Sequence, residues 1–135
     1  MSDAKGSDHD LRNMLNSMNF VAKLDEVTRQ HNDAMRSFLL EFLVILDDLD
    51  RMIAQSSAPR RDLDVLQKQM LLVFERVGVE FLDALHGAFD PDYHHAVETV
   101  QSSGVQPDTI VEVIKRGCMF QGQLLRPAEV VVASE

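Results

Sequence analysis

The sequence predicts an α+β fold, with a long helical region followed by a small, mostly antiparallel β-domain. Two observations carry this prediction. Neither Pro nor Gly occurs between Asp10 and Pro59, which allows one long helix. Beyond Gly78 the apolar residues fall in short segments separated by turn residues, the pattern of successive strands. We therefore expect a disordered start (residues 1–10), a helical dimerisation region (residues 11–78) and a β-domain (residues 79–135).

The first helix is indicated by apolar residues at steps of three and four. Residues 1–10 are polar and favour disorder. A weak periodic pattern begins at Leu11 and strengthens after residue 34. The stronger stripe consists of Met35, Phe38, Leu39, Phe42, Leu43, Leu46, Leu49 and Ile53. The aspartates opposite it are expected on the solvated side of the helix: Asp47, Asp48 and Asp50.

A second helix is expected after the polar break at residues 55–59. Asp62 is a candidate N-cap, and Gly78 lies where a C-capping glycine belongs. Its apolar seam is Leu63, Leu66, Met70, Val73 and Val77. Two helices cannot cover so broad an apolar surface by themselves. A four-helix bundle built from two chains would cover it, and packing of both helices on their own sheet is the alternative.

The β-domain is expected to contain six short strands. They lie at residues 79–82, 96–100, 110–114, 119–120, 124–125 and 130–132. At residues 89–91, Asp90 can bond the backbone ahead, Pro91 fixes the turn and Phe89 anchors it. Gln121-Gly122 is a candidate hairpin tip, and Arg126-Pro127 before a strand suggests an edge.

Composition bounds the possible functions. The formal net charge of −9 argues against a nucleic-acid binder. Residues 79–135 carry nine acidic residues against Lys115, Arg116 and Arg126, which suits either solubility or steering toward a basic partner. The lone Cys118, the polar start and the lack of a long apolar run favour a cytoplasmic protein with no membrane partner.

No residue pattern indicates a catalytic centre. His86, Asp90 and His94 recur at a spacing of four, but Gly87 and Pro91 interrupt any helix between them, so we expect no metal. The serine pairs lack a nucleophile-elbow context, and no glycine-rich nucleotide motif occurs. Hence neither a cofactor nor direct nucleotide binding is expected.

One set of residues nevertheless follows a known family pattern in order and spacing. In the helical region it includes residues 46–51 and the 77–79 junction. In the β-domain it comprises Phe89, Asp90, Pro91, His94, Ala96, Val97, Val105, Pro107, Thr109, Gly117, Gly122, Leu125, Arg126, Ala128, Val130 and Val132. From about Phe38 to Val132 the chain resembles GrpE proteins, the nucleotide exchange factors of DnaK-type chaperones.

The resemblance implies a homodimer whose β-domain presses on the chaperone's ATPase domain, so that ADP leaves; such a protein is not an enzyme. It assigns chaperone contacts to Ile114, Lys115, Gln123 and Val132. It assigns shaping of the β-domain to Phe89, Asp90, Pro91, His94, Gly117, Gly122 and Arg126. It assigns the dimer interface to Leu39, Phe42, Leu46, Leu49, Leu66, Met70 and Val73.

The chain departs from the family pattern at several positions. Cys118 stands where an aromatic residue is usual, Gln123 where many members have an arginine, and Glu129 where an apolar residue is common. The long helix also carries few basic residues near residues 20–23. An adaptor or scaffold without exchange activity is therefore the second hypothesis. A metal-dependent enzyme using His86, Asp90 and His94 is a weaker third.

Overall fold

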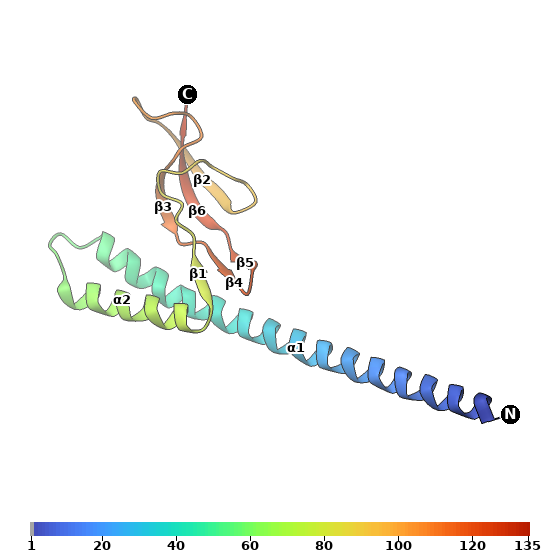
Figure 1. The fold of residues 1–135 in the computed structure, drawn as a ribbon. Helices are drawn as coiled ribbons and strands as arrows, with labels where there is room; N and C mark the ends of the chain where they lie inside the picture. Colours follow the sequence, from blue (N-terminus) through green and yellow to red (C-terminus); the bar gives the residue numbers. More distant parts are fainter. Residues whose placement is uncertain (1) are drawn as a thin grey trace. The chain divides into compact units, whose positions relative to one another are not determined.

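The part of the chain that the structure describes forms two helices followed by six strands, which confirms the α+β prediction (Figure 1). The structure, a computed structural model, describes the backbone of residues 2–135 and the side chains of residues 7–135. The elements are α1 (Ser2–Ala54), α2 (Arg61–Arg76), β1 (Val79–Phe81), β2 (His94–Gln101), β3 (Ile110–Lys115), β4 (Cys118–Phe120), β5 (Gln123–Arg126) and β6 (Ala128–Ser134). Within the described residues, no helix is long and apolar enough to cross a membrane.

The helix α1 begins earlier than the composition of residues 1–10 suggests. Residues 2–10 are helical, while Met1 lies outside the described residues. Residues 2–10 contain no Pro, so a helix can continue through them. A polar composition does not exclude helix, and the side chains of residues 7–10 are exposed on it.

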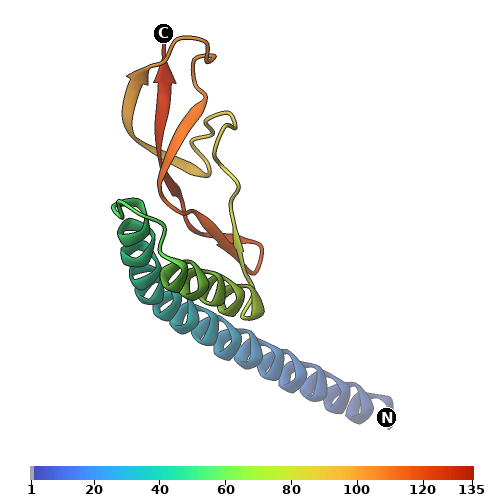
Figure 2. The ribbon, with the colours of Figure 1, turned by 90° about the vertical axis from the view of Figure 1, so that its left-hand side faces the viewer.

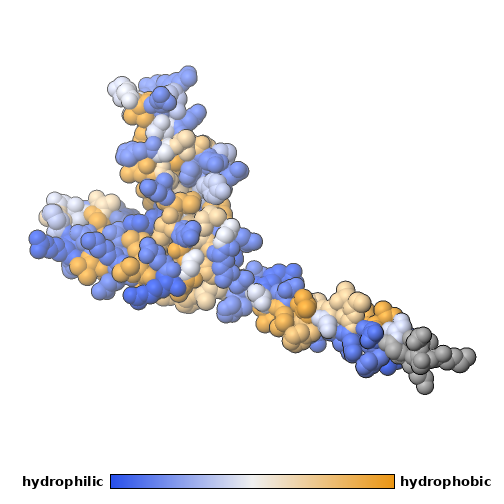
Figure 3. Space-filling view, viewed as in Figure 1, coloured by the Kyte–Doolittle hydropathy of each residue, from blue (hydrophilic) through white to orange (hydrophobic). Residues whose placement is uncertain are grey.

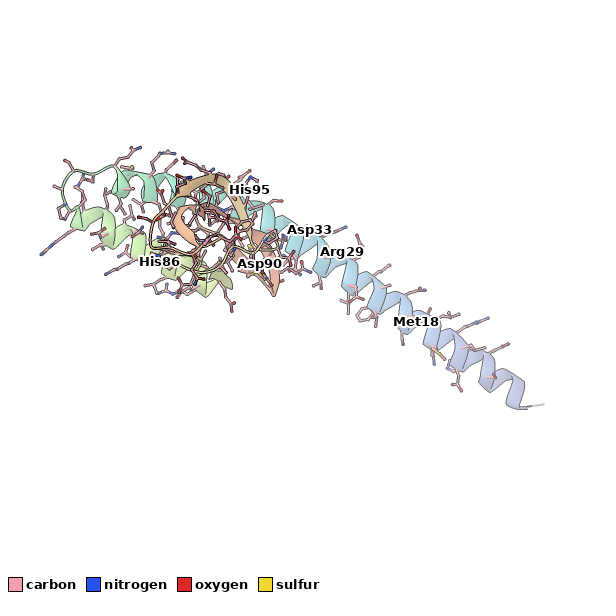
Figure 4. All side chains as sticks on the ribbon, turned by 90° about the horizontal axis from the view of Figure 1, so that it is seen from above. Met18, Arg29, Asp33, His86, Asp90 and His95 are labelled. Atoms are coloured by element: carbon pink, nitrogen blue, oxygen red, sulfur yellow. The ribbon has the colours of Figure 1, made fainter. Side chains whose placement is uncertain are left out.

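The chain forms two units, and the first of them ends at Phe38. It consists of the N-terminal part of α1, and apart from the half-buried Met35 the large apolar side chains described here are exposed. Met18, for example, is 61% exposed and projects from the helix (Figure 4). The other exposed apolar residues here are Leu11, Met14, Leu15, Phe20, Val21, Leu24, Val27 and Phe38. Their patches appear along this part of the helix in Figure 3.

The second unit, Leu39–Glu135, contains the rest of α1, α2 and the β-domain. Within it, α2 lies beside the C-terminal part of α1 (Figures 1 and 2). One face of α1 is fully buried at Leu39, Leu43, Leu46 and Leu49, which follow the helical spacing. From α2, Phe74 is buried and meets the Phe81 ring edge to face, with 5.7 Å between ring centroids. This contact joins α2 to β1.

The two ends of α2 differ in how well the sequence predicted them. The N-cap is Arg60, so the assignment of Asp62 as N-cap is wrong; Asp62 lies in the first turn instead. There its carboxylate accepts hydrogen bonds from the Arg60 guanidinium at 3.1 and 2.9 Å. These bonds, helped by the Leu63 backbone N–H, hold the pKa of Asp62 below its usual value. At the other end Gly78 follows the C-cap with a φ of 99°, as a capping glycine should.

The strands form two three-stranded sheets, ordered β1-β4-β5 and β2-β6-β3. Three of the four strand pairs are antiparallel, but β2 and β6 run parallel. Periodicity locates strands without naming their partners, so it predicts neither the division into two sheets nor the parallel pair. The edge assigned to the strand after Pro127 is also wrong, because β6 is central in its sheet (Figure 2, red between gold and orange). Pro127 lies between β5 and β6, where no ladder bond is required.

The larger sheet has its own small core. Ile110 from β3 packs with three residues of β6, and Phe89 and Val113 cover the cluster. The buried members are Ala84, Ile110, Ala128, Val130 and Val132. Hence β6, which is central in the larger sheet and largely buried, holds that sheet together.

Candidate functional site

Three of the four predicted chaperone contacts are exposed. Ile114 and Lys115 end β3, with Ile114 48% exposed, and Gln123 begins β5. The Lys115 ammonium lies 3.7 Å from the Glu129 carboxylate, a loose pair at the surface. Val132 is different: only 4% of it is exposed, and it belongs to the core of the larger sheet. Its side chain therefore supports the sheet and exposes little surface, and its role as a chaperone contact stays a prediction.

The turn before β2 is held by its own hydrogen bonds. The Asp90 carboxylate accepts a bond from the Asp92 N–H at 3.0 Å, and its carbonyl accepts from Tyr93 and His94. The Asp90 N–H in turn donates to Nδ1 of His94 at 2.9 Å. The Phe89 and His94 rings lie 6.0 Å apart. Together these contacts fix where β2 begins.

Two glycines have distinct steric roles in the β-domain. A Cβ at Gly117 would lie 2.4 Å from the backbone nitrogen of Ala128, so only glycine fits between β4 and β6. Gly122 forms the tip of the β4–β5 hairpin with Gln121, and both have positive φ, 76° and 51°. That pair of angles suits a tight two-residue hairpin loop. Arg126 then ends the hairpin, opposite Cys118.

Two arginines of the β-domain bind two aspartates of α1. The Arg126 guanidinium forms a fork with the Asp47 carboxylate, at 2.7 and 2.8 Å. It also donates two bonds to the backbone carbonyl of Arg116. The Arg116 guanidinium binds Asp50 at 2.7 and 3.2 Å, and Gln67 of α2 donates to Asp50 at 2.6 Å. We call these five residues the Arg–Asp network.

The Arg–Asp network is largely shielded from solvent. The side chains of Asp47 and Arg126 are 10% and 17% exposed, and those of Asp50 and Arg116 are 22% and 33% exposed. Arg116 also lies over the Phe81 ring, 5.9 Å from its centroid. The expectation that Asp47 and Asp50 face solvent is therefore wrong. It holds for Asp48, which pairs with Arg51 at the surface.

The predicted dimer residues divide between two environments. Leu39, Leu46 and Leu49 are buried within their own chain. Phe42, Leu66 and Val73 are between 42 and 53% exposed, and Met70 is half-buried. Some of the predicted dimer residues therefore pack within their own chain, whereas others form an outward apolar face of the helices.

The candidate metal ligands do not gather. Among the described residues, no three His, Cys, Asp or Glu side chains come together as a metal site would need. His86 and Asp90 occupy separate places in the β-domain, as Figure 4 shows. Asp90 and His94 are engaged in the turn described above.

Comparison with known proteins agrees with this architecture. A family model described as GrpE matches residues 8–134. The chain belongs to the GrpE family. It is 32% identical over 115 residues to a protein of Nitrosococcus oceani named Protein GrpE, covering 80% of this chain and 55% of that protein. A Methylococcus capsulatus protein of the same name is 33% identical, with coverage of 80% and 62%.

A third relative bearing that name, from Xanthomonas euvesicatoria, is 36% identical over 112 residues, covering 80% of this chain and 65% of that protein. The chain thus spans less than two thirds of each of these three relatives. These matches confirm the resemblance to GrpE proteins that the sequence pattern indicated.

Sequence reasoning within the GrpE pattern misplaced Asp47 and Asp50 on the solvated side of the helix and assigned no role to Arg116. A signal was present. Arg116 and Arg126 are two of only three basic residues in a β-domain with nine acidic ones. Buried or half-buried arginines require carboxylate partners. Asp47 and Asp50 are spaced by three, adjacent to the buried leucines at 46 and 49, and were the natural candidates.

Proposed function

We propose that this chain is a dimeric nucleotide exchange factor that binds the ATPase domain of a DnaK-type chaperone in the cytoplasm and promotes ADP release. The family match over residues 8–134 carries the proposal, since it includes all six strands of the β-domain that would meet the chaperone. No bond is made or broken in such a reaction, so the protein would act without catalytic residues. The exposed contact set is then Ile114, Lys115 and Gln123.

The mechanism follows from differential binding. An exchange factor opens a nucleotide cleft only if it binds the open chaperone more tightly than the closed one. The same coupling requires that bound ADP weaken the binding of the exchange factor. Couplings of this kind typically amount to about 5–150-fold in affinity. No nucleotide needs to touch this chain.

Dimerisation is supported by the apolar surface that the second unit leaves uncovered. On α1, Phe42, Ile45 and Met52 are exposed at helical spacing. On α2 the exposed apolar residues are Val65, Leu66, Leu72 and Val73, and Val77 follows at the C-cap. A second copy would cover both surfaces in a four-helix bundle. Sedimentation equilibrium tests this, and a monomer at micromolar concentration would contradict it.

Stopped-flow release of a fluorescent ADP analogue tests the function. The analogue is loaded on the cognate chaperone, and release is followed with and without this protein. We expect faster release that saturates with protein concentration. Binding to the chaperone without faster release would instead support an adaptor of the same fold.

A further inference from the structure

The Arg–Asp network connects the β-domain to both helices through directional bonds. Arg126 comes from the end of β5, and Arg116 from the segment between β3 and β4. Each reaches a different carboxylate of α1, one helical turn apart, and Gln67 adds α2. Because Arg126 also binds the Arg116 carbonyl, the two ion pairs are linked to each other. Movement of the hairpin would therefore strain both pairs.

Stability alone is a poor explanation for such a network. A buried ion pair contributes little net free energy compared with well-packed apolar residues of similar size. Its distinctive property is geometry, since a guanidinium fork binds a carboxylate in one plane and one direction. Apolar burial, as at the contact between Phe74 and Phe81, imposes no comparable direction.

We propose that Asp47, Asp50, Arg116 and Arg126 are positioning residues that hold the β-domain in one orientation on the helices. This inference rests on the proposed function. A rigidly held β-domain fits the open chaperone and clashes with the closed one, which creates the difference in affinity. A β-domain that is free to rotate would fit both states of the chaperone. The difference in affinity between the open and the closed chaperone would then be lost.

Two single variants and a matched control separate geometry from charge. Asp47→Asn removes the charge and keeps the shape of the side chain. Arg126→Lys keeps the charge and removes the fork, since an ammonium cannot bond Asp47 and the Arg116 carbonyl in the same geometry. Asp48→Asn is the control, because it removes the same charge from the same helix at an exposed position outside the network.

The first measurement is a distance between the helix and the β-domain. Spin labels are attached at Glu41→Cys on α1 and Glu98→Cys on β2, two exposed positions, while the native Cys118 is buried. The labelled chain is diluted into excess unlabelled protein so that each dimer reports one distance. We expect one narrow distribution for the wild type and Asp48→Asn, and a broader one for Asp47→Asn and Arg126→Lys. Equal widths in all four would overturn the inference.

The second measurement is the ratio of affinities for nucleotide-free and ADP-bound chaperone. We expect this ratio to fall at least about fivefold in Asp47→Asn and Arg126→Lys, and to stay unchanged in Asp48→Asn. A merely structural role would lower the folded fraction and weaken both affinities equally. An unchanged ratio in folded variants would contradict the inference.

A fallback double variant covers misfolding of the single variants, and the distance measurement separates failure of this inference from failure of the proposed function. If the single variants fail to fold, Asp47→Leu with Arg126→Met replaces the pair by apolar residues and retains burial; the same broad distribution and lowered ratio are expected. If the wild type itself shows no difference in affinity, the proposed function fails. The distance distributions, which need no chaperone, still decide the positioning role.

Discussion

Arg126 and Asp47, 79 positions apart in the sequence, form a two-bond ion pair at 2.7 and 2.8 Å that joins the last hairpin of the β-domain to the first helix. The side chains are only 17% and 10% exposed. The pair lies one turn from its counterpart, Arg116 with Asp50. Asp47 and Asp50 of this helix therefore bind within their own chain.

Removing one member of this pair should be costly. Asp47→Ala leaves the Arg126 guanidinium shielded and without its carboxylate, so we expect a loss of about 3–5 kcal/mol in the free energy of unfolding. Asp48→Ala, at an exposed pair on the same helix, should cost less than about 1 kcal/mol. Urea unfolding at one fixed protein concentration measures both. Equal losses of unfolding free energy in the two variants would mean that the Arg126–Asp47 pair stabilises the fold no more than an exposed pair does.

Neighbouring residues on α1 should separate folding from self-association. Leu46 is fully buried in its own chain, so Leu46→Ala should cost about 2–5 kcal/mol of unfolding free energy. The proposed dimer should weaken with it. Ile45 is 54% exposed on the outward face, and Ile45→Ala should leave the unfolding of the monomer nearly unchanged while weakening the dimer. Sedimentation equilibrium combined with urea titration distinguishes the two, and a dimer unaffected by Ile45→Ala would contradict the outward interface.

The elements of the fold could be predicted from the sequence, but several of their contacts could not. Helix and strand positions follow from local periodicity and from breakers such as Gly78, which the structure confirms. Whether a carboxylate such as Asp47 faces water or a distant arginine depends on tertiary packing, which periodicity does not contain. The same reason hides the parallel pairing of β2 with β6 and the burial of Val132.

The start of α2 provides a pH test. Because the pKa of Asp62 is lowered in the folded protein, its ionised form stabilises α2 above the unfolded value near 3.8. That contribution is lost as the pH falls through the lower folded value. Asp62→Asn should therefore be slightly less stable than the wild type at pH 7, and the difference should vanish in acid. In an Arg60→Gln background the same Asp62→Asn substitution should make a smaller pH-dependent difference, because the Arg60 hydrogen bonds are the main cause of the lowered pKa of Asp62. An undiminished difference in that background would contradict the assignment.

The space at Gly117 is too small for any other residue. A Cβ there would meet the backbone nitrogen of Ala128 at 2.4 Å and its Cα at 2.9 Å, and backbone cannot rotate away. Gly117→Ala should lower the unfolding free energy by about 1–3 kcal/mol or more. Hydrogen exchange at the start of β6 should rise with it. Gly87→Ala meets a single carbonyl at 3.2 Å and should cost less. Equal costs would contradict the steric assignment.

The exposed Gln123 gives the most direct test of the proposed chaperone contact. The family resemblance places an arginine at this position, so Gln123→Arg should restore a charge-assisted hydrogen bond to the chaperone. Such bonds contribute about 1.5–3 kcal/mol, which corresponds to an affinity gain of about tenfold or more. The gain should shrink as salt rises, because the contact lies at the surface. Gln121→Arg adds the same charge to the tip of the same hairpin and serves as the control. An affinity equal to that of the wild type at low salt, or an equal gain in Gln121→Arg, would remove Gln123 from the interface.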